Sequence, residues 1–179
     1  MQIPCLSAGR SNFKMKTQNS KLFKQRMRKA KQWARIIAQN SNVVMVAMTG
    51  SMATGNATKK SDIDFFIQVS PNQIWSARFF IMLKLKLADA QPERYARAGK
   101  ICLNWWADFN APQKSHTKHI VLFQRTADQK ISQPDFFEKF CRWVQIWRLK
   151  LEKKKGNTLI RISNRELRLR HKLDYNTLD

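Results

Sequence analysis

The sequence predicts an α/β protein, because stretches with helical spacing alternate with short apolar stretches typical of strands. The segment from Val43 to Gln68 carries the densest pattern: a strand, a turn with glycine, a short helix and a second strand. Helical spacing precedes it at Lys21 to Gln39 and follows it at Gln73 to Leu87. The chain has 179 residues, 43% of them hydrophobic, which is enough for one domain with a packed core.

The domain organisation follows from the same patterns. Residues 1–20 are polar and lack periodicity, so we expect a flexible leader there and a single domain over residues 21–179. Within it, residues 42–108 form the expected core and residues 118–155 a C-terminal helical part. The apolar window from Ile74 to Ala90 is interrupted by three basic residues and does not predict a membrane span.

Further elements complete the prediction. Strands are expected at Asn42 to Met48, Lys100 to Ala107 and Leu159 to Ile162, whereas Ile120 to Phe123 fits either a strand or a helix. Pro134 to Lys154 predicts a helix, and the tail from Arg165 onward is interpreted as a helix that wraps back. The apolar stripes expected to face the core are Phe23, Met27, Ala30, Ala34 and Ile37 in the first helix, Trp75, Phe79, Met82, Leu83 and Leu87 in the second, and Phe137, Phe140, Val144, Trp147 and Leu151 in the last.

The charge balance points to anionic partners. The chain has 34 basic and 12 acidic residues, a net charge of +22, which attracts RNA, DNA, nucleotides or an anionic surface. A merely solvated basic surface is the alternative. On the first helix, one basic face is a candidate for nucleic-acid contact; its residues are Lys24, Arg28, Lys31 and Arg35.

The three cysteines are far apart in sequence, which argues against a disulfide framework and against a zinc site. This usage fits a reducing compartment, and we expect a cytoplasmic location. Cys102 and Cys141 fall on apolar segments, so we expect both to be small core residues.

Two acidic residues on the second strand are the main candidates for chemistry. Asp62 and Asp64 are two residues apart, so their side chains project from the same face of a strand. Ionised carboxylates this close repel one another unless a cation lies between them, and Mg²⁺ prefers such oxygen ligands. The alternative is that Asp62 caps a turn while Asp64 pairs with a surface lysine. The apolar residues around the pair argue against that alternative.

The preceding turn has the features of a phosphate site. Gly50 tolerates positive φ and lets a ligand approach the backbone, while Ser51 supplies a hydroxyl and is expected to cap the short helix. Free N–H groups at a helix start suit phosphate. Asn56 extends the polar turn, and Lys60 lies just before the acids, where it can screen phosphate charge.

Gly50-Ser51, ten intervening residues and then Asp62-Ile63-Asp64 resemble the signature of the DNA polymerase beta-like nucleotidyltransferase superfamily, and more narrowly its small single-domain members. The run from Ile101 to Trp106 resembles a strand found in some of them. The resemblance implies a small mixed β-sheet flanked by helices, with Gly50 and Ser51 holding phosphates and the acid pair holding metal, two Mg²⁺ ions in all. The superfamily usually has a third carboxylate on a neighbouring strand; here that position falls to Asn104 or Asp108.

The resemblance therefore implies a metal-dependent enzyme that moves a nucleoside monophosphate from an NTP, with ATP expected, to a hydroxyl. RNA or tRNA, a protein and a small molecule all stay open as acceptors, and the positive charge favours RNA. A first alternative is a non-catalytic RNA- or nucleotide-binding module on the same fold. A second is an antitoxin-like protein that works with a helical toxin-type partner.

Overall fold

The computed structural model describes residues 20–88, 99–111, 118–126, 134–154 and 158–171. The elements in chain order are α1 (Ser20–Ala38), β1 (Val43–Met48), α2 (Gly50–Thr54), β2 (Ile63–Val69), α3 (Ile74–Leu87), β3 (Ile101–Asp108), β4 (Ile120–Gln124), α4 (Phe136–Lys154), β5 (Thr158–Ile162) and β6 (Glu166–His171). The predicted α/β class is confirmed, and the expected leader lies almost wholly outside the described residues.

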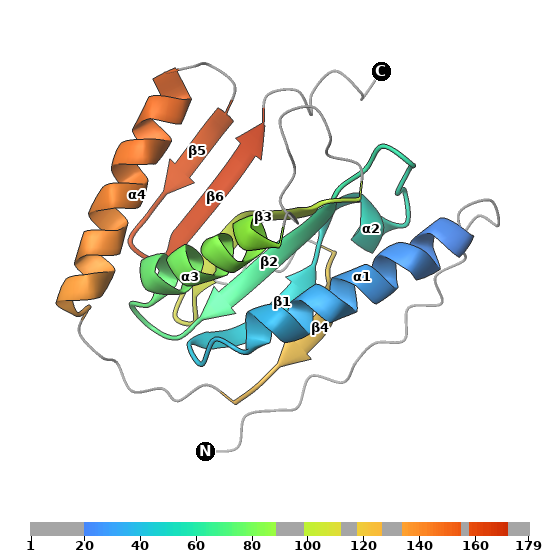
Figure 1. The fold of residues 1–179 in the computed structure, drawn as a ribbon, viewed down its shortest axis with the longest axis horizontal. Coiled ribbons are helices and arrows are strands. Elements are labelled where there is room, and N and C mark those ends of the chain that lie inside the picture. Colours follow the sequence, from blue (N-terminus) through green and yellow to red (C-terminus); the bar gives the residue numbers. More distant parts are fainter. Residues whose placement is uncertain (1–19, 89–98, 112–117, 127–133, 155–157, 172–179) are drawn as a thin grey trace.

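The six strands form one mixed sheet in the order β4-β1-β2-β3-β6-β5 (Figure 1). Strands β2 and β3 are parallel, and the other four neighbouring pairs are antiparallel. A parallel pair needs a crossover, and α3 lies in the connection between β2 and β3. This crossover places the starts of β2 and β3 at the same end of the sheet, which decides where the acid pair lies.

Alternation along β2 separates a core face from a polar face. Ile63, Phe65, Ile67 and Val69 are fully buried and belong to the same apolar core as Ala30, Ala34 and Ile37 of α1 and Ile81 and Leu85 of α3. The intervening residues of β2 therefore project from the opposite face, and Asp64 is among them. The apolar stripe predicted for α1 is confirmed, because Ala30, Ala34 and Ile37 are each at most 1% exposed.

The stripes predicted for α3 and α4 are largely wrong. In α3, Trp75 is buried as predicted, but Phe79 and Leu83 are 41% and 44% exposed. The other apolar residues that the helix buries lie outside the predicted stripe; they are Ile74, Ala77, Ile81 and Leu85. In α4, Phe140 and Trp147 are 50% and 60% exposed, whereas Cys141 and Leu149 are buried. Both helices are thus rotated relative to the arrangement that apolar spacing alone predicts.

Polar contacts between the helices explain this rotation. The buried Glu138 carboxylate accepts hydrogen bonds from the backbone N–H groups of Trp75, at 2.8 Å, and Ser76, at 2.7 Å, and so caps the start of α3 from α4. Further along α4, Gln145 Nε2 donates to the Trp75 carbonyl at 2.7 Å. Because a buried carboxylate is costly unless its oxygens are satisfied, these bonds fix which face of α4 meets α3.

The tail is also different from its prediction. Glu166–His171 forms strand β6, which pairs with β3 and with β5, and not a helix that wraps back. The segment at Ile120 is strand β4, which pairs with β1 and settles the strand-or-helix alternative. Within the part of the chain that is described, no helix is both long and apolar enough to cross a membrane.

Candidate active site

The turn after β1 lies directly against the start of β2. Gly50 opens the five-residue helix α2 with φ of +66°, a conformation that favours glycine, and the Thr49 N–H donates to the Asp64 carbonyl at 2.9 Å. Thr49 occupies the N-cap position without a side-chain cap bond, so the prediction that Ser51 caps the helix is wrong. Ser51 lies inside α2 and is half-buried.

Gly50 leaves room for the Asp64 carboxylate. A Cβ atom at position 50 would lie 2.3 Å from Asp64 Oδ2, closer than real Cβ atoms approach, and 3.2 Å from its Cγ, which is a tight contact. The glycine is therefore required twice at this position, once for its backbone angle and once for the space that it leaves. The pairing of turn and acid that the sequence pattern suggested is a direct steric contact here.

Three potential ligand atoms meet at this end of the sheet. One atom each from Asp62, Asp64 and Cys102 lie within 4.8 Å of one another, and all three residues are half-buried. Cys102 arrives there because it is the register partner of Asp64 in the parallel β2–β3 pair. The prediction that Cys102 is a core residue is therefore wrong, whereas Cys141, 2% exposed, does lie in the core. Register along β3 would have identified Cys102, but the pairing of β2 with β3 could not be aligned from sequence alone.

Asn104 contacts the acid pair directly. Its side-chain Nδ2 donates to Asp64 Oδ1 at 2.8 Å, which holds that carboxylate in orientation. Asn104 thus lies beside Asp64 at the place where the resemblance predicts a third carboxylate, and its side chain supplies an amide there.

Asp108 lies at the other end of β3, opposite Val69. A register shift between Asp64 and Phe66 inserts one extra residue into β3, so the side chains after it alternate in the opposite sense. The carboxylate of Asp108 is 2% exposed and accepts from the backbone N–H groups of Asn72, at 2.8 Å, and Asn110, at 2.7 Å. The structure therefore does not bring Asp108 to the acid pair, and its carboxylate instead closes the turn that follows β3.

Helix α1 supports the loop that leads into Asp62. The buried Arg26 guanidinium donates to the carbonyls of Thr58, at 2.6 Å, and Lys59, at 2.8 Å. Burial lowers the pKa of Arg26, while the Asp62 carboxylate acts in the opposite direction. Lys29 Nζ similarly holds the Gly99 carbonyl at 2.6 Å, just before β3. Helix α1 thus holds the segments that lead into β2, which carries Asp64, and into its neighbour β3.

The other predicted site residues lie around this centre. Asn56 and Lys60 are exposed on the loop between α2 and β2, and the Asn56 N–H donates to the Ser51 carbonyl at 2.9 Å. The basic residues proposed to contact nucleic acid on α1 are all exposed; they are Lys24, Arg28, Lys31 and Arg35.

The donor set fits a divalent cation. Two carboxylates supply hard oxygen ligands of the kind that Mg²⁺ takes, and their charges at this separation repel one another without a cation. The thiol of Cys102 is a soft ligand and suits Mg²⁺ poorly, so the two aspartates are the residues that would hold the ion.

A mixed sheet with an acid pair at the start of a central strand, packed against a glycine turn, is consistent with the nucleotidyltransferase fold. Residues 30–105 match the family model described as Nucleotidyltransferase domain. Over these residues the chain matches a nucleotidyltransferase domain, and the predicted resemblance to the polymerase beta-like superfamily is confirmed there. The match covers less than half of the chain, from the middle of α1 into β3, and includes the acid pair and the turn. No curated protein matched the chain.

Proposed function

We propose that the protein is a metal-dependent nucleotidyltransferase that moves a nucleoside monophosphate from an NTP to a hydroxyl acceptor. The observation that carries the proposal is the steric contact between Gly50 and Asp64, together with the grouping of Asp62, Asp64 and Cys102 within 4.8 Å. The nucleotidyltransferase family match supports the general reaction.

In this proposal Asp62 and Asp64 hold Mg²⁺, which supplies Lewis-acid stabilisation of charge on the phosphates when it is bound. If a second ion binds, the same two carboxylates have to coordinate it, since the described part of the site offers no third carboxylate. Asn104 fixes the orientation of Asp64. Gly50 and Ser51 bring backbone and hydroxyl groups to the outer phosphates of the NTP, with ATP expected, while Asn56 and Lys60 border the same space.

The reaction is an in-line substitution. The acceptor oxygen forms a bond to the α-phosphorus of the NTP, and the bond from that phosphorus to the bridging oxygen breaks. The electron pair leaves with pyrophosphate, and the acceptor proton passes to water or to a site carboxylate. The residues of the chain accelerate this step mainly by positioning the reactants.

The test is incorporation of label from α-labelled ATP into an acceptor, with and without Mg²⁺. Asp64→Asn should lower incorporation by about a hundredfold or more, because several kcal/mol of charge stabilisation depend on the metal and each 1.4 kcal/mol is a factor of ten. Asp135→Asn is the matched control, since Asp135 caps α4 through the Glu138 N–H and asparagine caps equally well. Equal incorporation by Asp64→Asn and by the unaltered chain would contradict the proposal.

A non-catalytic nucleotide- or RNA-binding module is a second candidate, favoured by one observation. The third position beside the acid pair holds the amide of Asn104, which cannot act as a base. This candidate expects ATP or RNA binding without incorporation of label in any acceptor tested. The two candidates therefore separate in the same assay.

A further inference from the structure

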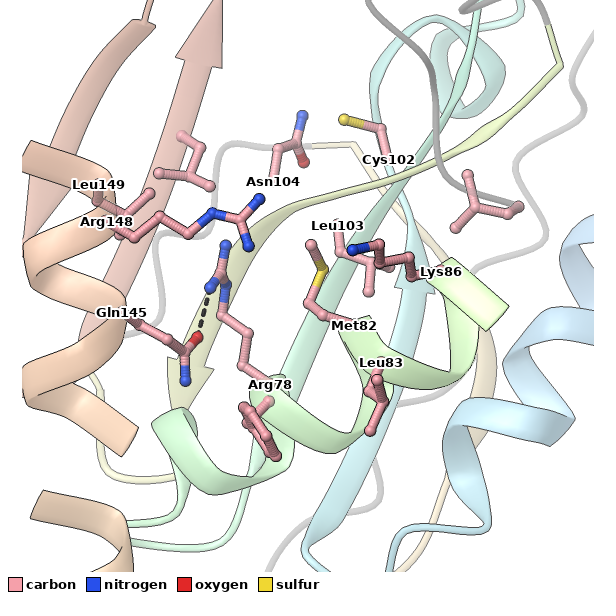
Figure 2. Close-up of a pocket in the computed structure, with 13 residues that line it drawn as sticks. Arg78, Met82, Leu83, Lys86, Cys102, Leu103, Asn104, Gln145, Arg148 and Leu149 are labelled. Carbon is pink, nitrogen blue, oxygen red and sulfur yellow. Dashed lines mark hydrogen bonds between the residues drawn. The ribbon is translucent and has the colours of Figure 1, made fainter. Parts of the chain in front are cut away.

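A pocket with a volume of about 420 Å³ lies between α3, α4 and the first half of β3 (Figure 2). Strand β6 pairs with β3 only from Trp105 to Ala107, so the first half of β3 is not paired with β6 beside the pocket. The residues that line this α3–α4 pocket are Arg78, Phe79, Met82, Leu83, Lys86, Ile101, Cys102, Leu103, Asn104, Gln145, Arg148, Leu149 and Leu169.

The lining combines positive charge with apolar surface. Three basic residues, Arg78, Lys86 and Arg148, face the pocket, and none of the thirteen lining residues is acidic. Figure 2 shows the guanidinium groups of Arg78, from α3, and Arg148, from α4, directed into the same space. Like charges that share a pocket repel one another, and an anion between them removes that repulsion and accepts charge-assisted hydrogen bonds from both.

The floor of the pocket is held in place. Arg78 is 7% exposed, and its Nη1 donates to Gln145 Oε1 at 2.5 Å. Gln145 in turn donates to the Trp75 carbonyl, and the N–H of the same residue donates to Glu138. A ligand would therefore meet a guanidinium that is already oriented, which reduces the entropy cost of binding. Arg148, which also lines the pocket, is exposed.

The far end of the pocket reaches the candidate active site. Cys102 and Asn104 line the pocket and also contact or neighbour Asp64, so one molecule can touch both places. A volume near 420 Å³ is at the small end of the range for small-molecule sites and suits a molecule about the size of a mononucleotide.

We infer that the α3–α4 pocket binds the acceptor, and that the acceptor is a phosphorylated small molecule of about mononucleotide size. Its phosphate lies between Arg78 and Arg148, its body packs on Met82 and Leu149, and a hydroxyl at its other end faces Asn104. The assignment of the bound molecule as the acceptor rests on the proposed function. The prediction that the pocket binds such a molecule does not.

Adenosine monophosphate is the probe, titrated by calorimetry without metal into the full chain. Arg148→Gln should weaken its binding at least tenfold, and adenosine, which lacks the phosphate, should bind at least tenfold more weakly than adenosine monophosphate. Met82→Trp should also weaken binding by filling the pocket. Arg142→Gln is the matched control: it removes one charge from α4, outside the pocket lining, and should change binding less than twofold.

Two outcomes would overturn the inference. One is binding that is unchanged in both Arg148→Gln and Met82→Trp, since that result places the probe outside the pocket. The other is a 5′-phosphorylated hexa-adenylate that binds at least tenfold more tightly than adenosine monophosphate through Arg148, which assigns the pocket to an RNA end. Probe binding that depends on Arg148 supports the pocket even if no transfer is detected, so failure of the proposed function is distinguishable from failure of the pocket.

Discussion

Replacing Gly50 by alanine tests the contact on which the candidate active site depends. The substitution has two consequences that can be estimated separately. A non-glycine residue at φ of +66° costs about 1–2 kcal/mol, partly offset by about 0.4–1 kcal/mol because alanine makes the unfolded chain less flexible. The net loss of about 1 kcal/mol corresponds to a Tm lower by about 2–4 °C in a chain of this size.

The second consequence is steric. The new Cβ would lie 2.3 Å from Asp64 Oδ2, so the carboxylate has to move by about 1 Å to reach ordinary contact distance. A displacement of about 1 Å in a reacting centre can cost a hundredfold in rate. We therefore expect Gly50→Ala to lower label incorporation from α-labelled ATP by about a hundredfold, and to weaken Mn²⁺ binding measured by electron paramagnetic resonance.

Gly99→Ala is the matched control. Gly99 has nearly the same backbone angle, φ of +69°, but a Cβ there meets no atom within 4 Å. It should lose a similar amount of Tm and keep both metal binding and incorporation. If Gly50→Ala retains metal binding and activity within a few-fold of the unaltered chain, or if Gly99→Ala loses as much, the steric reasoning is refuted.

Three further predictions concern neighbouring residues. Iodoacetamide, followed by mass spectrometry, should modify Cys102 well before Cys141, because burial raises the pKa of the Cys141 thiol. Mn²⁺ with ATP should slow the labelling of Cys102 but not that of Cys141, because Cys102 lies beside the acid pair. Asn104→Leu removes the donor to Asp64 and should weaken Mn²⁺ binding roughly 10- to 100-fold; unchanged affinity would show that the amide does not orient the carboxylate. Asp108→Asn should lower stability by about 1–3 kcal/mol in urea unfolding while incorporation per folded molecule stays the same.

The sequence predicts that Asp62, Asp64 and the Gly50 turn lie close together, and this closeness is found because the patterns behind it are local. Strand alternation places Asp62 and Asp64 on one face whatever lies around them, and Gly50 is needed by the backbone of its own turn. The positions of helices and strands are also local, so most of their bounds are correct within a few residues. Whether a predicted apolar stripe is buried depends instead on contacts with residues that are distant in sequence.

Helices α3 and α4 illustrate the limit. Each offers apolar side chains around most of its circumference, so spacing alone does not choose a face. The choice falls to Glu138 and Gln145, two polar residues whose partners are backbone groups on α3, distant in sequence. Satisfying a buried carboxylate outweighs burying the exposed aromatic residues of α4, because an unsatisfied buried charge costs more than a partly exposed ring.

The third position of the site shows the same limit in the sheet. Strict alternation along β3 places Asn104 and Asp108 on one face of the sheet. However, β3 has one extra residue between Cys102 and Trp105, the partners of Asp64 and Phe66, and this bulge reverses the alternation before Asp108. That bulge releases Asp108 to close the turn after β3 and leaves Cys102 and Asn104 with the acids. The same half of β3, not paired with β6, also lines the α3–α4 pocket. One irregular strand therefore both leaves the described part of the site without a third carboxylate and connects it to the α3–α4 pocket, where the proposed acceptor would lie between Arg78 and Arg148.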